Sequence, residues 1–390
     1  LYGDISTMRR TPLPLDLKGF ASDIDDLRTE LKQDIGSKDL AHFQGIERIV
    51  WCLVLLGLGT AWLGPNPIAV MALAAASFGR WTILSHHISH RGYENIPGAP
   101  ARYNSKTYAR GWRRIIDWLD WVYPEAWHHE HDVLHHYNLG EIGDPDVPQH
   151  NAHWLRKSRL PAALKVLIVT AIAIVWKPLY YAPNTLNALL NKKEKTDIEL
   201  GSWDLWSPMN KRFWMIVWHC WLPYISFRFV FLPSLFLLIS PEAALYALIN
   251  LLIAEVVINI WSYIVIVPNH AGSDIYVFDK HPVDRANFYL NQILGSADYN
   301  CGGNTQDFMQ GWLNYQIEHH VFPDLTVRQY QIAHRKIRDI CEKHNVPVVS
   351  ESIFKRVIKL TRILIGTDTQ PLWPGIVDTS LEKNKELVDA

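Results

Sequence analysis

Long apolar segments alternate with polar ones along this chain of 390 residues. A helix that crosses a bilayer needs about 20 apolar residues. Residues 50–79 carry no charge and are divided by Gly64-Pro65-Asn66-Pro67, so we expect a hairpin of two membrane helices there, at about 46–63 and 68–85. A second apolar region is broken at Ser240-Pro241-Glu242. It predicts a second hairpin, with helices at about 218–239 and 243–267.

A further apolar stretch, Ala162–Trp176, is shorter and is followed by Lys177-Pro178. Three histidine clusters, described below, lie outside the hairpin tips. If they form one site, they must lie on the same side of the membrane. The number of helices that cross the membrane between consecutive clusters must then be even. Counting Ala162–Trp176 as a span would make that number three between the second and third clusters. We therefore interpret this stretch as interfacial or packed within the polar domain, and expect four spans.

Lysine and arginine are confined to one side of this arrangement. None occurs between Val50 and Gly79, and none occurs between Phe229 and Asp279. Both hairpin tips therefore lack positive charge. By the positive-inside rule, the side that bears the histidines is the cytoplasm, or the stroma of a plastid.

Two charges fall inside the second hairpin. Arg228 lies 13 residues before Pro241, and Glu255 lies 14 residues after it. In an antiparallel hairpin they would reach the same depth, about 20 Å from the tip. We expect them to pair, because an unpaired charge within the membrane is costly. The alternative is that the third span begins near Arg228, whose side chain then extends to the interface.

The chain is expected to divide into a polar N-terminal arm over residues 1–45, a membrane domain over 46–345, and a C-terminal helix and tail over 346–390. Lys plus Arg (38) nearly balance Asp plus Glu (39), so nothing favours binding to nucleic acid. The 17 Trp and 16 Tyr are typical of a protein with aromatic belts at the membrane interface. The four cysteines form no Cys-x-x-Cys pair and predict no disulfide.

Three helices are predicted in the polar segments. Ser22 is expected to cap a helix in the N-terminal arm. The segment Ser105–Val122 contains three tryptophans and is typical of an amphipathic helix on the headgroup layer. Thr326 is expected to cap a helix that runs through Lys343 and stops at Asn345.

Eight of the 18 histidines of the chain lie in three clusters. The clusters are His86-His87-Ile88-Ser89-His90, His131-Asp132-Val133-Leu134-His135-His136 and Gln316-Ile317-Glu318-His319-His320. Histidines four residues apart lie on one face of a helix. Imidazole suits iron, copper and zinc, and this many ligands exceed what one metal ion needs. The clusters therefore suggest two metal ions.

The residue types favour iron over zinc. Structural zinc sites usually include cysteine, and the four cysteines lie outside the clusters. The paired Glu-x-x-His motifs of carboxylate-rich di-iron bundles are also missing from the sequence. Histidine ligands usually donate their second nitrogen to a carboxylate. The candidates for that role are Asp132, Glu130, Glu318 and Asp144.

The order and spacing of the clusters, together with the hairpins, resemble the membrane fatty acyl desaturases. The stretch Asn314–Pro323 is similar to the third histidine box of that family, and its glutamine resembles the front-end and acyl-lipid branches. The resemblance covers roughly residues 45–345. It implies an all-α integral membrane protein with four transmembrane helices in two hairpins and a helical cap domain, cytosolic or stromal, that holds a histidine-rich di-iron site.

The resemblance also implies a set of ligands to two iron ions. They are His86, His90, His131, His135, His136, His270, His319 and His320. Gln316, Asn269, Asp132 and Glu318 are expected to support these ligands. His87, His128 and His129 are left as supporting or structural residues, and His42, His219, His334 and His344 match no box.

The implied reaction uses dioxygen and two electrons to remove two hydrogens from a lipid acyl chain. The sequence has no His-Pro-Gly-Gly haem signature, so the electrons are expected from a separate protein, preferably a ferredoxin, with a free cytochrome as the alternative. The basic residues Arg110, Arg113, Arg114, Arg156 and Lys157 could dock such a carrier or face anionic lipid. The expected location is a multi-pass position in a plastid, thylakoid or cyanobacterial-type membrane, with the endoplasmic reticulum as the alternative.

Other functions stay open at this point. The same scaffold suits a hydroxylase or ketolase that acts on a lipid, sphingolipid or carotenoid, and a non-catalytic subunit of a membrane complex is a further alternative. A soluble zinc hydrolase is disfavoured by the two charge-free hairpins.

Overall fold

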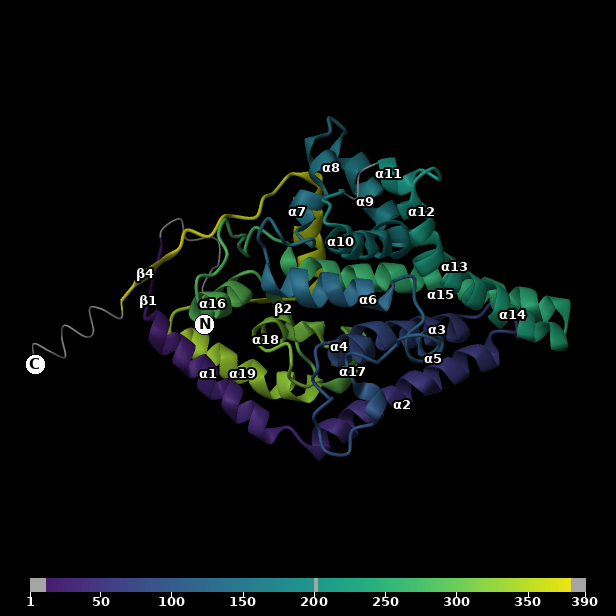
Figure 1. The fold of residues 1–390 in the computed structure, drawn as a ribbon, viewed down its shortest axis with the longest axis horizontal. Helices are drawn as coiled ribbons and strands as arrows, with labels where there is room; N and C mark the ends of the chain where they lie inside the picture. The colour runs from purple at the N-terminus through teal and green to yellow at the C-terminus, as the bar shows by residue number, and fades with distance from the viewer. Residues whose placement is uncertain (1–11, 200–202, 380–390) are drawn as a thin grey trace, which may run out of the picture. The chain divides into compact units, whose positions relative to one another are not determined.

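The computed structural model describes residues 12–199 and 203–379 (Figure 1). Most of them are helical. The first eleven residues of the predicted N-terminal arm and the last eleven of the predicted tail lie outside the described residues. Contacts divide the described chain into two units. The apolar unit consists of Leu40–Leu134 and Leu167–Ile264, and the polar unit consists of the described residues that remain. The predicted arm, membrane domain and tail stay a prediction.

Five helical segments of the described chain are long and apolar enough to cross a membrane. They are Ser37–Thr60, Pro67–Ser89, Ala162–Glu194, Lys211–Leu238 and Pro241–His270. The first is α2, the second contains α3 (Pro67–Phe78) and α4 (His86–Ser89), and the third contains α9 (Ala162–Trp176) and α10 (Ala182–Glu194). The fourth contains α12 (Lys211–Ile216), α13 (Leu222–Ile225) and α14 (Leu232–Ser234), and the fifth contains α15 (Pro241–Ile266). Four of them correspond to the expected spans. The additional one contains the stretch that we interpreted as interfacial, so the count of four spans in two hairpins stays a prediction.

Both hairpin turns lie where the sequence predicts them. Helix α2 ends at Thr60 and the next begins at Pro67, where Asn66 caps it by accepting from the Ala69 N–H at 2.8 Å. Asn250 of α15 is fully buried and donates to the carbonyls of Ala61 and Gly64, each at 2.8 Å. The turn between the first two helices is therefore anchored on α15 through backbone groups that lipid could not satisfy.

The expected pair of charges in the second hairpin is present. Arg228 Nε lies 3.2 Å from Glu255 Oε2. Glu255 also accepts hydrogen bonds from the Tyr224 hydroxyl at 2.6 Å and from the Trp121 indole N–H at 2.7 Å. A buried carboxylate with these partners is compensated for its loss of water.

The segment Ser105–Val122 differs from expectation, because its regular helix is only α5 (Arg113–Asp117). Ala109 and Gly111 have φ angles of 54° and 56°, which interrupt a helix. The Asp117 carboxylate explains the fold: it accepts from the Ala109 N–H at 3.2 Å and from the Arg113 side chain at 2.6 Å. The chain therefore turns back on itself instead of lying flat as one amphipathic helix. The other short helices of the apolar unit are α6 (Pro124–Trp127) and α11 (Trp203–Trp206).

Helices and two small sheets make up the described part of the polar unit, and the mostly helical character of the predicted fold class is confirmed. Strand β1 (Leu13–Leu15) pairs in parallel with β4 (Ile376–Asp378), and β2 (Ala297–Tyr299) pairs in parallel with β3 (Val349–Glu351). The helices are α1 (Leu17–Asp34), α7 (Pro148–Asn151), α8 (His153–Lys157), α16 (Arg285–Leu294), α17 (Asn304–Met309), α18 (Gln316–Val321), α19 (Val327–Lys343) and α20 (Ile353–Ile365).

Helix α1 is a packed element that lies against α19 (Figure 1). It begins at Leu17, and its cap is Asp16, which accepts from the Gly19 N–H, so the predicted cap at Ser22 is wrong. The predicted cap at Thr326 and the end of α19 at Lys343 are confirmed. All four cysteines are free, as expected.

Candidate metal centre

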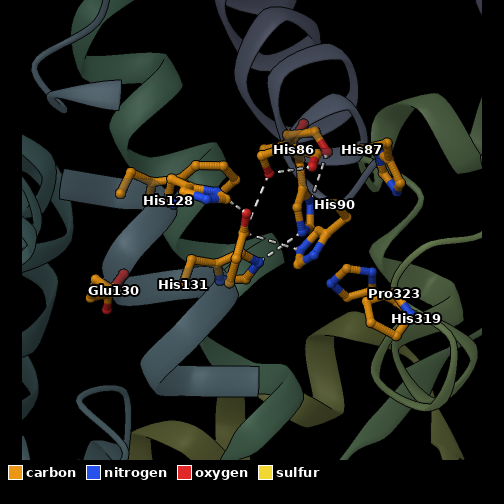
Figure 2. A network of polar contacts seen from close by, with 12 residues as sticks. His86, His87, His90, His128, Glu130, His131, His319 and Pro323 are labelled. Carbon is orange, nitrogen blue, oxygen red and sulfur yellow. Dashed lines mark hydrogen bonds and ion pairs between the residues drawn. The ribbon is translucent and has the colours of Figure 1, made fainter. Parts of the chain in front are cut away.

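The first group of histidines belongs to the apolar unit. His86 and His90 lie at the end of the second long apolar helix, and His131 belongs to a π-helical turn, His128–His135. Figure 2 shows the three rings close together: the Nε2 atoms of His86 and His131 are 2.8 Å apart, and the His90 ring centre lies 5.1 Å from that of His86 and 5.2 Å from that of His131. Two imidazole nitrogens that point at one place are typical of ligands to a shared ion.

Neighbouring side chains fix these rings. The Trp127 ring is stacked on His131 at 4.8 Å between centres. The Asp132 carboxylate lies 3.4 Å from His90 Nε2 and accepts a hydrogen bond from the Ser89 hydroxyl at 3.3 Å. His128 also contacts Asp132 (Figure 2). Burial raises the pKa of the Asp132 carboxyl. Asp132 therefore lies beside the predicted ligand His90 and is contacted by His128, and its supporting role stays a prediction.

The second group belongs to the polar unit and contains His135, His270 and His320, whose nitrogens lie within 4.8 Å of one another. Each Nδ1 faces an oxygen: Asp144 Oδ1 at 2.9 Å from His135, Gln292 Oε1 at 2.9 Å from His320, and the Gly295 carbonyl at 3.1 Å from His270. A proton on Nδ1 then leaves the Nε2 lone pair of His135 and His320 for a metal ion. In His270 that nitrogen faces the amide nitrogen of Gln316.

The charge on His135 is controlled by Asp144. Burial disfavours the imidazolium form, but the Asp144 carboxylate outweighs burial and raises the pKa of His135. The same carboxylate accepts from the Gly140 and Asp146 N–H groups at 2.8 and 2.9 Å, which fix its position.

His136 and His319 complete the set in the polar unit. The His136 ring is stacked on His320 at 4.3 Å between centres and meets His319 edge-on at 4.6 Å. His319 Nδ1 lies 3.3 Å from the Tyr330 hydroxyl. Of the eight predicted ligands, six are buried, and His131 and His270 are half-buried.

Gln316 and Asn269 form a chain of hydrogen bonds that ends on a predicted ligand. Asn269 donates to Gln316 Oε1 at 2.9 Å, and the amide nitrogen of Gln316 lies 2.8 Å from His270 Nε2. Asn269 also donates to the Leu313 carbonyl at 2.9 Å. Both residues therefore lie where they can support His270.

Glu318 has different neighbours from those that its place in the third box predicts. Its Oε1 lies 3.1 Å from Nδ1 of His334, which matches no box, and Asp298 lies 3.5 Å from the same nitrogen. Burial disfavours the charged form of His334, but Glu318 outweighs it and raises the pKa of His334. Arg338 approaches Asp298 to 3.7 Å. His334 and Arg338 thus face the carboxyl groups of Glu318 and Asp298, and burial raises the pKa of Asp298 well above its usual value. We assign this cluster a structural role.

Several supporting residues are absent from the sequence-based predictions. Gln292 faces His320 and also donates to the His136 carbonyl at 3.2 Å, and Tyr330 faces His319. The one signal in the sequence that could have identified Gln292 is its polar amide among the apolar residues of the buried face of α16. His87 and His129 are buried, and His87 Nδ1 lies 2.8 Å from the Ile83 carbonyl.

The donor set fits iron. It offers imidazole nitrogens, with the Nδ1 atoms of His135, His270 and His320 facing oxygen atoms, and none of the four cysteines is a member of either histidine group. Imidazole-rich sites of this kind suit divalent iron, copper or zinc. The absence of thiolate from the groups argues against a structural zinc site.

Comparison with known proteins identifies the class. The sequence model of the fatty acid desaturase family matches residues 60–352, and the chain belongs to that family. It is 33% identical over 109 residues to an NADPH-dependent stearoyl-CoA 9-desaturase of Mycobacterium tuberculosis. It is 35% identical over 86 residues to a Delta(8)-fatty-acid desaturase, and 30% identical over 115 residues to an acyl-lipid (9-3)-desaturase, both of Borago officinalis.

These alignments cover 22–28% of this chain and 18–25% of each relative. The chain thus spans a quarter or less of the length of these relatives. No solved structure matches the chain.

Proposed function

We propose that this protein is a di-iron, dioxygen-dependent desaturase that introduces a double bond into a lipid acyl chain. The observation that carries the proposal is the set of eight imidazoles, three in the apolar unit and five in the polar unit, where the Nδ1 atoms of His135, His270 and His320 face oxygen atoms. The relatives named as fatty acid and acyl-lipid desaturases support the choice of substrate.

In this proposal, His86, His90, His131, His135, His136, His270, His319 and His320 hold the two ions. Bound iron would supply the activation of dioxygen. The chain's own residues orient the rings and limit the entry of water: Asp144 and Gln292 hold the second nitrogen of two rings, and Trp127 covers His131. Positioning of this kind is the contribution of the protein in metal-assisted chemistry.

The location and the electron donor are part of the proposal. We place the protein in a membrane, with a plastid, thylakoid or cyanobacterial-type membrane preferred to the endoplasmic reticulum. A separate ferredoxin is the preferred donor, and a free cytochrome is the alternative. Three of the basic residues considered for docking make internal contacts: Arg113 with Asp117, and Arg114 and Arg156 with backbone carbonyls. They are therefore poor candidates for binding the carrier.

The test is expression of the wild type and of His319→Ala in a host with simple lipids, together with a ferredoxin system. Fatty acids are profiled by mass spectrometry, and iron is measured in the purified proteins. We expect a new double bond and about two iron ions per chain in the wild type, and loss of both in the variant. The matched control is His153→Ala, an exposed histidine outside the boxes, which should behave like the wild type.

The outcomes separate the alternatives. A hydroxylated or oxo product would favour a hydroxylase or ketolase on the same scaffold. Two iron ions without any product from lipids supplied in excess would favour a non-catalytic subunit. A wild type that binds no iron would contradict the proposal.

A further inference from the structure

His270 is the one predicted metal ligand that lies outside the three histidine boxes. It ends a 3-10 turn, Val267–His270, and the backbone of the next residue, Ala271, is extended, with φ −134° and ψ 125°. A regular helix therefore does not continue past His270 to hold its backbone. The place of this imidazole in the group with His135 and His320 depends on contacts from other parts of the polar unit.

One of these contacts comes from Arg356, a fully buried residue of α20. Its Nη2 atom donates to the Ala271 carbonyl at 2.7 Å, and Nε and Nη2 both donate to the Pro268 carbonyl at 3.4 Å. Pro268 and Ala271 lie on either side of Asn269-His270. The guanidinium is planar and has its donors in a fixed geometry, so it sets the distance between these two peptide groups.

The charge of Arg356 is compensated next to this loop. Its Nη1 atom donates to both oxygens of Asp274, at 2.6 and 2.8 Å, and Lys359 donates to the same carboxylate at 2.6 Å. Burial would raise the pKa of the Asp274 carboxyl, but the two cations outweigh burial and lower it. Asp274 is therefore a charged anchor that holds the guanidinium in place.

Gly272 allows Arg356 to come this close to the loop. A Cβ atom at this position would lie less than 3.0 Å from the carboxylate of Asp274 and from the guanidinium of Arg356, closer than real Cβ atoms approach their neighbours. Any side chain here would therefore push one of the two groups away. The loop that carries His270 thus has the one residue type that this contact with α20 permits.

A second contact comes from Gln370, which follows α20 and is 4% exposed. Its side-chain nitrogen donates to the His270 carbonyl at 3.0 Å. Arg356 and Gln370 together thus donate to three carbonyls of this loop. The desaturase family model matches residues 60–352, so both donors come from a segment of the chain beyond the matched region.

We propose that Arg356 is a positioning residue for His270 and that Gln370 assists it. Together they fix the backbone of His270 and thereby the place of its ring among the metal ligands. Both act on peptide groups rather than on the ring. The proposal rests on the function proposed above in that His270 is taken as a ligand. Loss of a group that orients a histidine ligand weakens metal binding about 10- to 100-fold.

The test uses the purified full chain loaded with cobalt(II) in place of iron, because the visible spectrum of cobalt reports its coordination. Arg356→Lys keeps a cation beside Asp274 but loses the planar fork that reaches the two carbonyls. Cobalt is removed with chelators of increasing strength, and hydrogen exchange of residues 267–275 is followed by mass spectrometry. We expect one ion to bind about tenfold more weakly, its spectrum to change, and exchange in this segment to become faster.

A second variant and a matched control separate positioning from stability. Gln370→Met removes the donor to the His270 carbonyl and should give the same pattern to a smaller extent, and it decides the question if Arg356→Lys does not fold. The control is Lys359→Met, because Lys359 also donates to Asp274 but has Glu351 as its second partner instead of a carbonyl of the loop. It should lower the temperature of unfolding and leave the release and the spectrum of cobalt unchanged.

Cobalt release and spectra like those of the wild type in both Arg356→Lys and Gln370→Met would overturn the proposal, even if both variants unfold at a lower temperature. Faster exchange of the segment with unchanged cobalt binding would show that the contacts only stabilise the loop, with the same consequence. The function is judged separately, on product: a wild type that binds metal but forms no double bond contradicts the proposed function and leaves this comparison intact.

Discussion

The contact between Asp144 and His135 gives the sharpest prediction about the candidate metal centre. The Asp144 side chain is almost fully buried and lies 2.9 Å from His135 Nδ1. It also accepts from the N–H groups of Gly140 and Asp146. Both oxygens of this carboxylate therefore have a donor in front of them.

The change to test is Asp144→Asn, which keeps the shape of the side chain. One oxygen becomes an NH2 group, so at least one of the three donors faces another donor, and the remaining bonds lose their charge. Loss of a hydrogen bond to a charged group costs about 1.5–3 kcal/mol of folding free energy. Loss of the carboxylate behind a histidine ligand weakens metal binding about 10- to 100-fold.

The assay is iron content per chain after dialysis against chelators of increasing strength, with thermal unfolding measured in parallel. The matched control is Asp146→Asn, because Asp146 Oδ2 is 4.0 Å from the same nitrogen and its side chain is 25% exposed. We expect Asp144→Asn to release iron to a weaker chelator than the wild type, and the control to resemble the wild type. Equal iron retention in Asp144→Asn and the wild type would refute the role of Asp144 in orienting His135.

Three further predictions concern stability. Glu255→Gln leaves Arg228 as an uncompensated buried charge and should lower the free energy of unfolding by about 3–5 kcal/mol, whereas the double variant with Arg228→Met should be less unstable than the single one in thermal unfolding. Asn250→Leu leaves two carbonyls of the first hairpin turn without donors and should cost about 1–3 kcal/mol in the same assay. His334 has a raised pKa in the folded protein, so its contribution is fully present below about pH 6.5 and is lost as the pH rises through the folded pKa. His334→Gln should therefore flatten the decline in melting temperature between about pH 6 and pH 8.5, and a decline as steep as that of the wild type would contradict this assignment.

The features that could be predicted from the sequence are those with a local cause. Proline and asparagine define the turn before Pro67, and a threonine at the right place begins α19. The pairing of Arg228 with Glu255 was also predictable, because the hairpin geometry places them at one depth and lipid penalises a single charge.

The features that were missed depend on partners far away in the chain or on tertiary context. Asp117 turns the chain back at Ala109 and thereby replaces a helix that the pattern of apolar residues favours. Asp16, rather than Ser22, caps α1, because the helix begins earlier to pack on α19. Gln292 is recognisable as a partner of His320 only once α16 and α18 are packed together.

The pairing of β1 with β4 has a consequence for the order in which the protein is made. Strand β1 leaves the ribosome well before its partner at Ile376–Asp378. Helix α1 likewise packs on α19, which is made later than α1. The apolar hairpins can thus enter the membrane during synthesis while the N-terminal segment still waits for its partners. We expect the polar unit, which includes His319 and His320, to close only after α19 and β4 have been made.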